Sequence, residues 1–160
     1  MDISRKTDYA LRMLAMLAEG NKSLLSVRTA AEAVDAPYSF ARSIQHGLVQ
    51  AGIVESLRGV RGGMRLRLKP SEITIRQIVE AVQGPLVMND CTAEEGMCPR
   101  MECCCYHPIW AGAQELLRDY LDSVTLDDVV NHRQYPAVDV KFTDRDRFVE
   151  YASCGKVCGK

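Results

Sequence analysis

IVESLRGVRGGMRLRL, the sequence of residues 53–68, decides the fold of this chain. Apolar and polar residues alternate over residues 53–58 and again over 64–68, and three glycines lie in the five residues between them. Such alternation on both sides of a glycine-rich turn is typical of a β-hairpin. We therefore expect a two-stranded hairpin with Arg61 at its tip.

Three helices are predicted upstream of this hairpin. Residues 4–19 carry apolar side chains at helical spacing, and Ser26 can cap a second, short helix that Pro37 stops. A third helix is expected over residues 38–51. Two short helices across a tight turn, followed by a hairpin, indicate a winged helix-turn-helix.

The third helix and the hairpin carry polar side chains suited to DNA contacts. Five of them are expected on the outer side of the helix: Ser39, Arg42, Ser43, Gln45 and His46. On the hairpin, Arg58 and Arg61 can contact phosphates or enter the minor groove. An ordinary basic hairpin is the simpler interpretation, but its place directly after two short helices favours a wing.

Two more helices are predicted downstream of the hairpin. Thr74 and Gln77 form a capping box for a helix that ends at Gly84 and is expected to pack beneath the hairpin. Pro108 fits the first turn of a long helix with a broad apolar stripe. A helix this apolar on a small domain indicates packing against a partner chain.

Five of the seven cysteines lie within residues 91–107. Thiolates select zinc, copper(I) or iron–sulfur clusters, and a loop poor in apolar residues gives no reason to bury so many cysteines in a core. Their odd number and uneven spacing argue against a disulfide framework. The loop is therefore predicted to hold a soft metal, whereas Cys154 and Cys158 are more simply explained as incidental thiols.

Length and composition restrict the class of protein. A chain of 160 residues suffices for about one domain, and no apolar run approaches the roughly 20 residues that span a membrane. The N-terminus lacks the apolar stretch of a secretory signal, so we expect a cytoplasmic protein. We find no nucleophile with an oriented base and no phosphate-binding loop, so neither an enzyme nor a small-molecule substrate is predicted.

The net charge of −1 conceals two oppositely charged halves. Residues 1–70 carry eleven Lys and Arg against six acids, and the remainder carries nine against fifteen. A basic half joined to an acidic half is expected of a nucleic-acid-binding protein with a separate sensing or dimerising part. Solvated surface on both halves is the alternative explanation.

The order of these motifs resembles the IscR/NsrR/RirA superfamily of winged-helix transcription regulators. The resemblance rests on the YALR motif at residues 9–12, the RGxxGG wing at 58–63, and a cysteine loop that continues to Trp110. It covers residues 1 to about 131. It implies a homodimer that binds a double-stranded DNA operator, with an iron–sulfur cluster deciding which operators are bound and how tightly.

The expected fold class is mainly α with a small β-hairpin, a winged helix-turn-helix plus a long C-terminal dimerisation helix. Four segments follow from it: 1–84 as the DNA-binding domain, 85–107 as the cluster-binding loop, 108–131 as the dimerisation helix and a short following helix, and 132–160 as a weakly ordered tail.

Three cysteines are implied as cluster ligands by the resemblance. Cys91, Cys98 and Cys104 give the spacing C-x6-C-x5-C, followed by His107 after two further residues. Cys103 and Cys105 stay open as alternatives to Cys104. The first gap is one residue longer than in the IscR and NsrR patterns, so the cluster type does not transfer directly.

Two residues compete for the fourth ligand position. His107 matches the histidine that ligates a 2Fe-2S cluster in IscR-like members. Asp8 matches the aspartate that ligates a 4Fe-4S cluster in NsrR-like members. Both ligands, and both cluster types, stay open.

The ligation, charge and exposure of such a cluster would make it responsive to oxygen, nitric oxide, redox poise or iron and cluster supply. The loop joins the helix after the hairpin to the long helix, so its order can change the spacing of two recognition helices. A zinc-stabilised DNA-binding or interaction module fits a Cys3His set as well. An electron-transfer iron–sulfur protein is the weaker alternative, because it has no need of a basic winged helix.

Overall fold

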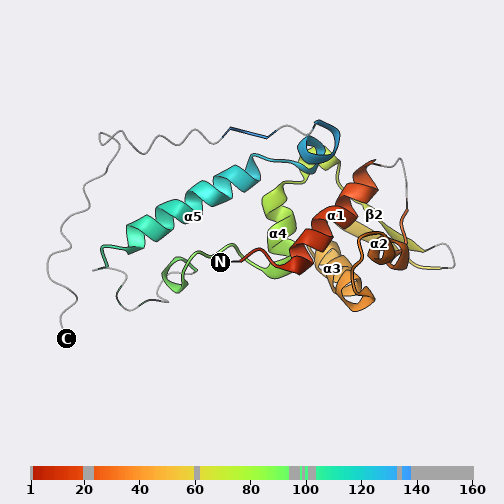
Figure 1. The fold of residues 1–160 in the computed structure, drawn as a ribbon, viewed down its shortest axis with the longest axis horizontal. Coiled ribbons are helices and arrows are strands. Elements are labelled where there is room, and N and C mark those ends of the chain that lie inside the picture. Colours follow the sequence, from red (N-terminus) through yellow and green to blue (C-terminus); the bar gives the residue numbers. More distant parts are fainter. Residues whose placement is uncertain are drawn as a thin grey trace.

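The computed structural model of the chain describes residues 2–19, 24–59, 62–93, 98, 100, 104–132 and 135–137. Figure 1 shows a mainly helical molecule with one two-stranded hairpin, which confirms the predicted fold class. The expected tail at 132–160 lies largely outside the described residues, and so do Arg61, Cys103, Cys154 and Cys158. The elements follow the order α1 (Arg5–Glu19), α2 (Val27–Ala33), α3 (Tyr38–Gln50), β1 (Val54–Leu57), β2 (Gly63–Leu66), α4 (Ile75–Gln83), η2 (Asp90–Thr92), α5 (His107–Asp122) and the π-helical turn η4 (Asp128–His132).

The core lies where the apolar faces of α1, α3 and α4 meet, with α2 and the hairpin closing one side. Met13 on α1, Leu48 on α3 and Ile78 on α4 are fully buried. Burying an apolar side chain of this size contributes roughly 1.5–3 kcal/mol, so these helical stripes hold the body together.

A tight turn joins α2 to α3. The Oγ atom of Ser26 accepts a hydrogen bond from the backbone nitrogen of Thr29 at 3.0 Å, which caps α2 as predicted. The turn passes through Asp35, whose φ of 52° lies in the left-handed region that aspartate tolerates better than most residues. Pro37 then precedes α3, and buried Ala30 and Ala41 lie in the core beside the turn.

The hairpin is pinned to the helical body by a close backbone contact. Its strands pair antiparallel, with Val54 opposite Leu66. Leu25 and Met64 exchange two backbone hydrogen bonds of 2.9 and 2.8 Å. A Cβ atom on the neighbouring Gly63 would lie 2.6 Å from the carbonyl oxygen of Leu25, so glycine is required for this approach.

The predicted capping box opens α4, since Thr74 and Gln77 exchange hydrogen bonds of 3.0 and 3.2 Å. The prediction that α4 packs beneath the hairpin is wrong. Its main packing partners are α1, α3 and α5. The reason is a close approach to α3, where a Cβ atom on Gly47 would lie 2.4 Å from the carbonyl oxygen of Ala81.

Figure 1 shows α5 running out from the body formed by α1 to α4 and the hairpin. On α5 only Gln114 is buried, whereas Ile109 and Leu116 are 58% and 50% exposed. The chain then returns to the body, where Leu126 donates a backbone hydrogen bond to Ile73 at 2.8 Å. Among the described residues, no helix has the length and hydropathy needed to cross a lipid bilayer.

Candidate functional site

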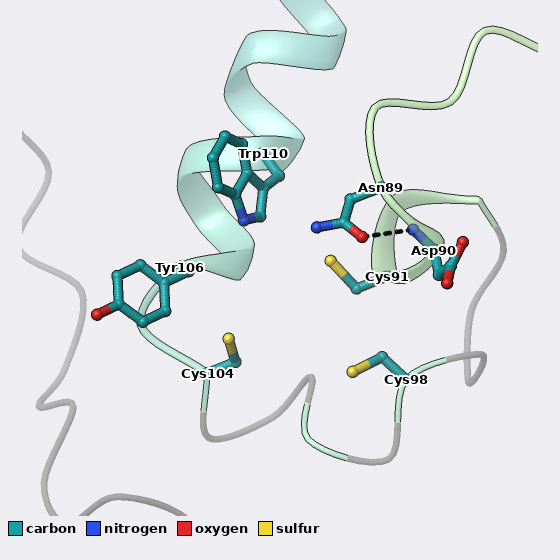
Figure 2. A pocket seen from close by; sticks show the side chains of 7 residues that line it. All are labelled: Asn89, Asp90, Cys91, Cys98, Cys104, Tyr106 and Trp110. Carbon is teal, nitrogen blue, oxygen red and sulfur yellow. Dashed lines mark hydrogen bonds between the residues drawn. The ribbon is translucent and has the colours of Figure 1, made fainter. Parts of the chain in front are cut away.

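Three of the loop cysteines line one pocket of about 640 Å³. Figure 2 shows Cys91 on η2, Cys98 on the loop and Cys104 before α5, arranged around a shared space. All three are half-buried free thiols. The remaining lining residues are Asn89, Asp90, Tyr106 and Trp110. Cys105 is exposed and lies outside this lining, so the arrangement favours Cys104 over Cys105.

The spread of these thiols matters for the kind of metal they suit. Among the described residues, no group of three or more His, Cys, Asp or Glu side chains is close enough to hold a metal ion. A zinc ion needs four donors at about 2.0–2.3 Å from one centre. In an iron–sulfur cluster the protein ligands are divided among two or more irons, so they need not all reach one metal centre. Three soft thiol donors that line one roomy pocket are suited by type to an iron–sulfur cluster or to zinc.

The two candidate fourth ligands lie outside this pocket lining. His107 begins α5, and its Nδ1 atom is buried without a hydrogen-bond partner among the described residues. A buried polar atom of this kind calls for a partner. Asp8 is exposed on α1 and forms an ion pair with Arg12 at 3.0 Å.

Gln114 ties the cysteine loop to α5, a role that the sequence reasoning missed. Its Oε1 atom accepts hydrogen bonds from the backbone nitrogen of Met88 at 2.9 Å and from the hydroxyl of Thr92 at 2.7 Å. Its Nε2 atom donates to the carbonyl oxygen of Thr92 at 3.0 Å. Cys91 directly precedes Thr92, so Gln114 places this thiol. The sequence did offer a signal for this role, because Gln114 is a polar residue next to the apolar stripe of α5.

An ion-pair network joins α4 to α5 beside the same loop. Arg76 on α4 contacts Glu80 at 3.3 Å and Asp122 on α5 at 2.7 Å. Burial opposes its charge, but the hydrogen bond to Glu80 and the nearby carboxylates raise the pKa of Arg76. The loop itself is held from both helices, because Leu86 donates to Glu80 at 3.4 Å and accepts from Arg118 at 3.2 Å.

The other candidate surface lies on α3 and the hairpin. Ser39, Arg42, Ser43 and His46 are exposed on α3, as predicted, and Arg58 is exposed at the end of β1. The prediction for Gln45 is wrong, because this residue is only 7% exposed. Its side chain turns toward the hairpin and donates to the Oγ atom of Ser56 at 3.1 Å.

A comparison with protein families explains this pairing of a basic winged helix with a cysteine loop. A family profile described as "Rrf2: Iron-dependent Transcriptional regulator" matches residues 3–132. The chain belongs to the Rrf2 family. Membership makes it a DNA-binding transcription regulator with a winged helix-turn-helix, and not an enzyme.

Relatives and solved structures agree with this assignment. Protein aau3 of Rhizobium meliloti (strain 1021) is 32% identical over 134 residues, which cover 83% of this chain and 87% of that protein. The HTH-type transcriptional regulator IscR of Aliivibrio salmonicida is 28% identical over 131 residues, covering 81% and 77%. The structure of CymR (YrzC), the global cysteine regulator of B. subtilis, matches with a TM-score of 0.65 and 26% identity, covering 82% of this chain and 98% of that one.

Proposed function

We propose that this Rrf2 protein is a homodimeric regulator whose operator affinity is controlled by an iron–sulfur cluster at Cys91, Cys98 and Cys104. The observation that carries the proposal is the gathering of these three thiols around one pocket (Figure 2). The iron dependence named in the family description supports it. When bound, a cluster supplies a centre that responds to oxygen, nitric oxide, redox poise or iron supply.

Contacts at the start of the cysteine loop connect it to the proposed DNA-binding surface. Gln114 holds the loop on α5, and Glu80 on α4 accepts from the backbone of Leu86, where the loop begins. Helix α4 in turn lies against Gly47 of the recognition helix α3. A change in the order of the loop therefore acts on α3 through α4.

The homodimer is proposed from the exposed face of α5. Ile109, Trp110 and Leu116 on this helix are 58%, 38% and 50% exposed. A group of large apolar side chains on one extended helix is stabilised by burial against a partner. A second copy would present two recognition helices to two operator half-sites, spaced about one DNA turn apart.

The proposal has two versions for the fourth ligand. In the first, His107 completes the set from the start of α5, three residues after Cys104. In the second, Asp8 does so from α1, whose first turn is tied to the end of α4 by a 2.7 Å hydrogen bond between Thr7 and Gln83.

Anaerobic purification with absorption spectroscopy and native mass spectrometry tests the cluster and the dimer together. We expect a brown dimer whose DNA affinity changes when oxygen or nitric oxide is added. Serine variants of Cys91, Cys98 or Cys104 are expected to lose the colour, whereas Cys105→Ser, the matched control, keeps it. A colourless protein that carries zinc would replace the proposal with the zinc-stabilised module.

The fourth ligand is tested separately with His107→Ala and Asp8→Ala. An altered cluster spectrum in only one variant selects that residue. Unchanged spectra and unchanged DNA affinity in both variants would overturn both versions while leaving the three cysteines in place.

A further inference from the structure

A basic groove of about 350 Å³ lies between the start of α2, the recognition helix α3 and the hairpin. Three arginines line it, one from each element: Arg28, Arg42 and Arg58. None of its described lining residues is acidic. Three guanidinium groups with no carboxylate among them form a site for an anion with several oxygen acceptors.

Arg28 is the lining arginine that the motifs of the sequence did not single out. Its side chain is exposed and makes no ion pair with the described residues, so none of them neutralises its charge. Its Cζ atom lies 5.1 Å from the centre of the Tyr38 ring. This cation–π contact holds the guanidinium of α2 beside the ring at the start of α3.

Arg42, which lines the same groove from α3, is also held by a neighbouring side chain. Its Nη1 atom donates to the Oε1 atom of the buried Gln45 at 3.3 Å. An amide oxygen leaves the positive charge in place, so Arg42 is oriented without being paired to an acid. Two side chains that are positioned beforehand lose less freedom when they bind a ligand.

We propose that this groove binds a backbone phosphate of DNA and that Arg28 is a DNA-contacting residue of this regulator. In a helix-turn-helix the recognition helix enters the major groove while the preceding helix crosses the sugar-phosphate backbone. Arg28 lies on that preceding helix, and Arg58 faces the same groove from the hairpin. The backbone phosphate is therefore the anion that this surface meets when α3 binds.

The test is the salt dependence of binding to a labelled duplex that the wild-type protein selects from a random pool, and to an unrelated duplex. Each phosphate contact that is removed lowers the slope of log K against log salt by about one unit. We expect Arg28→Ala to show this loss on both duplexes and to weaken binding several-fold at low salt. Arg28→Lys keeps the charge and is expected to keep most of the slope.

Two further variants separate the contact from general effects. Arg67→Ala removes the same charge from an exposed hairpin position outside the groove lining, and is expected to change the slope less than Arg28→Ala. Tyr38→Leu removes the ring and weakens binding while the slope is retained.

Circular dichroism and thermal unfolding establish that each variant is folded. Arg28→Ala with wild-type slope and affinity would overturn the proposal. Equal slope losses in Arg28→Ala and Arg67→Ala would also overturn it, because the effect would then be one of total charge. If inorganic phosphate bound the groove while Arg28→Ala left DNA affinity unchanged, the assignment of the groove to DNA would be contradicted.

Discussion

Gln45 on the recognition helix donates a hydrogen bond to the Oγ atom of Ser56 on the hairpin, with 3.1 Å between the two heavy atoms. The same amide accepts from Arg42 at 3.3 Å. One buried side chain thus links the hairpin to α3 and orients Arg42, an arginine of the proposed DNA-binding surface.

Gln45→Leu is expected to reduce DNA affinity clearly while it lowers the free energy of unfolding only slightly. Leucine fills a similar volume, so the free energy of unfolding should fall by no more than about 1.5 kcal/mol. Arg42 and the hairpin lose their shared anchor, which should reduce operator affinity several-fold. Gln50→Leu, at an exposed position on the same helix, is the matched control for fluorescence anisotropy. Wild-type affinity in Gln45→Leu would contradict this role.

Gly47→Ala is expected to destabilise the protein even though alanine is the better helix former. The new Cβ atom would lie 2.4 Å from the carbonyl oxygen of Ala81, so α3 and α4 must move apart. Overpacking of this kind costs about 1–3 kcal/mol, against a gain of about 1 kcal/mol in helix propensity. Urea unfolding measures the difference.

Gly112→Ala serves as the control for that substitution, because no atom of the described residues beyond its own turn of α5 lies within 4 Å of the added Cβ atom. It is expected to leave the stability of the protomer unchanged or to raise it. If Gly47→Ala were as stable as Gly112→Ala, the close contact between α3 and α4 would be refuted.

Gln114→Leu is expected to free the start of the cysteine loop. The substitution removes the partners of Met88 and Thr92, and each buried polar group left unpaired costs about 1–3 kcal/mol. In metal-free protein, alkylation of Cys91 by iodoacetamide, followed by mass spectrometry, should become faster. Glu115→Gln, at the next and exposed position, should leave the rate unchanged. An unaltered Cys91 rate in Gln114→Leu would show that the loop is held elsewhere.

Asp128 makes the stability of the segment after α5 depend on pH. Hydrogen bonds from the hydroxyl and the backbone nitrogen of Thr125 hold the pKa of Asp128 below its ordinary value. The carboxylate therefore adds stability that is fully present above about pH 4, the usual value for aspartate, and is lost as the pH falls through the lower folded pKa.

The melting temperatures of wild type and Asp128→Asn should thus differ at neutral pH and converge in acid. Asp119→Asn, at an exposed position on α5, is the control and should track the wild type throughout. A gap between wild type and Asp128→Asn that does not narrow as the pH falls below about 4 would count against this assignment.

Local signals in the sequence predicted the elements well because their partners lie only a few residues apart. Ser26 caps α2 through Thr29, and Thr74 and Gln77 cap each other across one helical turn. The alternating pattern and the glycine-rich turn likewise predicted the hairpin, whose strands are joined by a short connection. Periodicity and capping depend on such neighbours and so can be deduced without tertiary structure.

Long-range partners were beyond the reach of these patterns. The prediction placed Gln45 on the outer side of α3, whereas its partner Ser56 turns it inward. The prediction placed α4 under the hairpin. In the structure α4 packs against α3, because Gly47 has no side chain to keep the two helices apart. In each case the deciding contact joins residues that only the folded chain brings together.

The sequence by itself determined the order of helices and hairpin and the basic character of the DNA-binding half, and it predicted a soft metal in the cysteine loop. Only the tertiary structure decided that Cys91, Cys98 and Cys104 share a pocket, that Gln114 holds their loop, and that Arg28 faces the groove with Arg42 and Arg58. The physical reason is that composition and spacing act along the chain, whereas a binding site depends on which side chains meet across it.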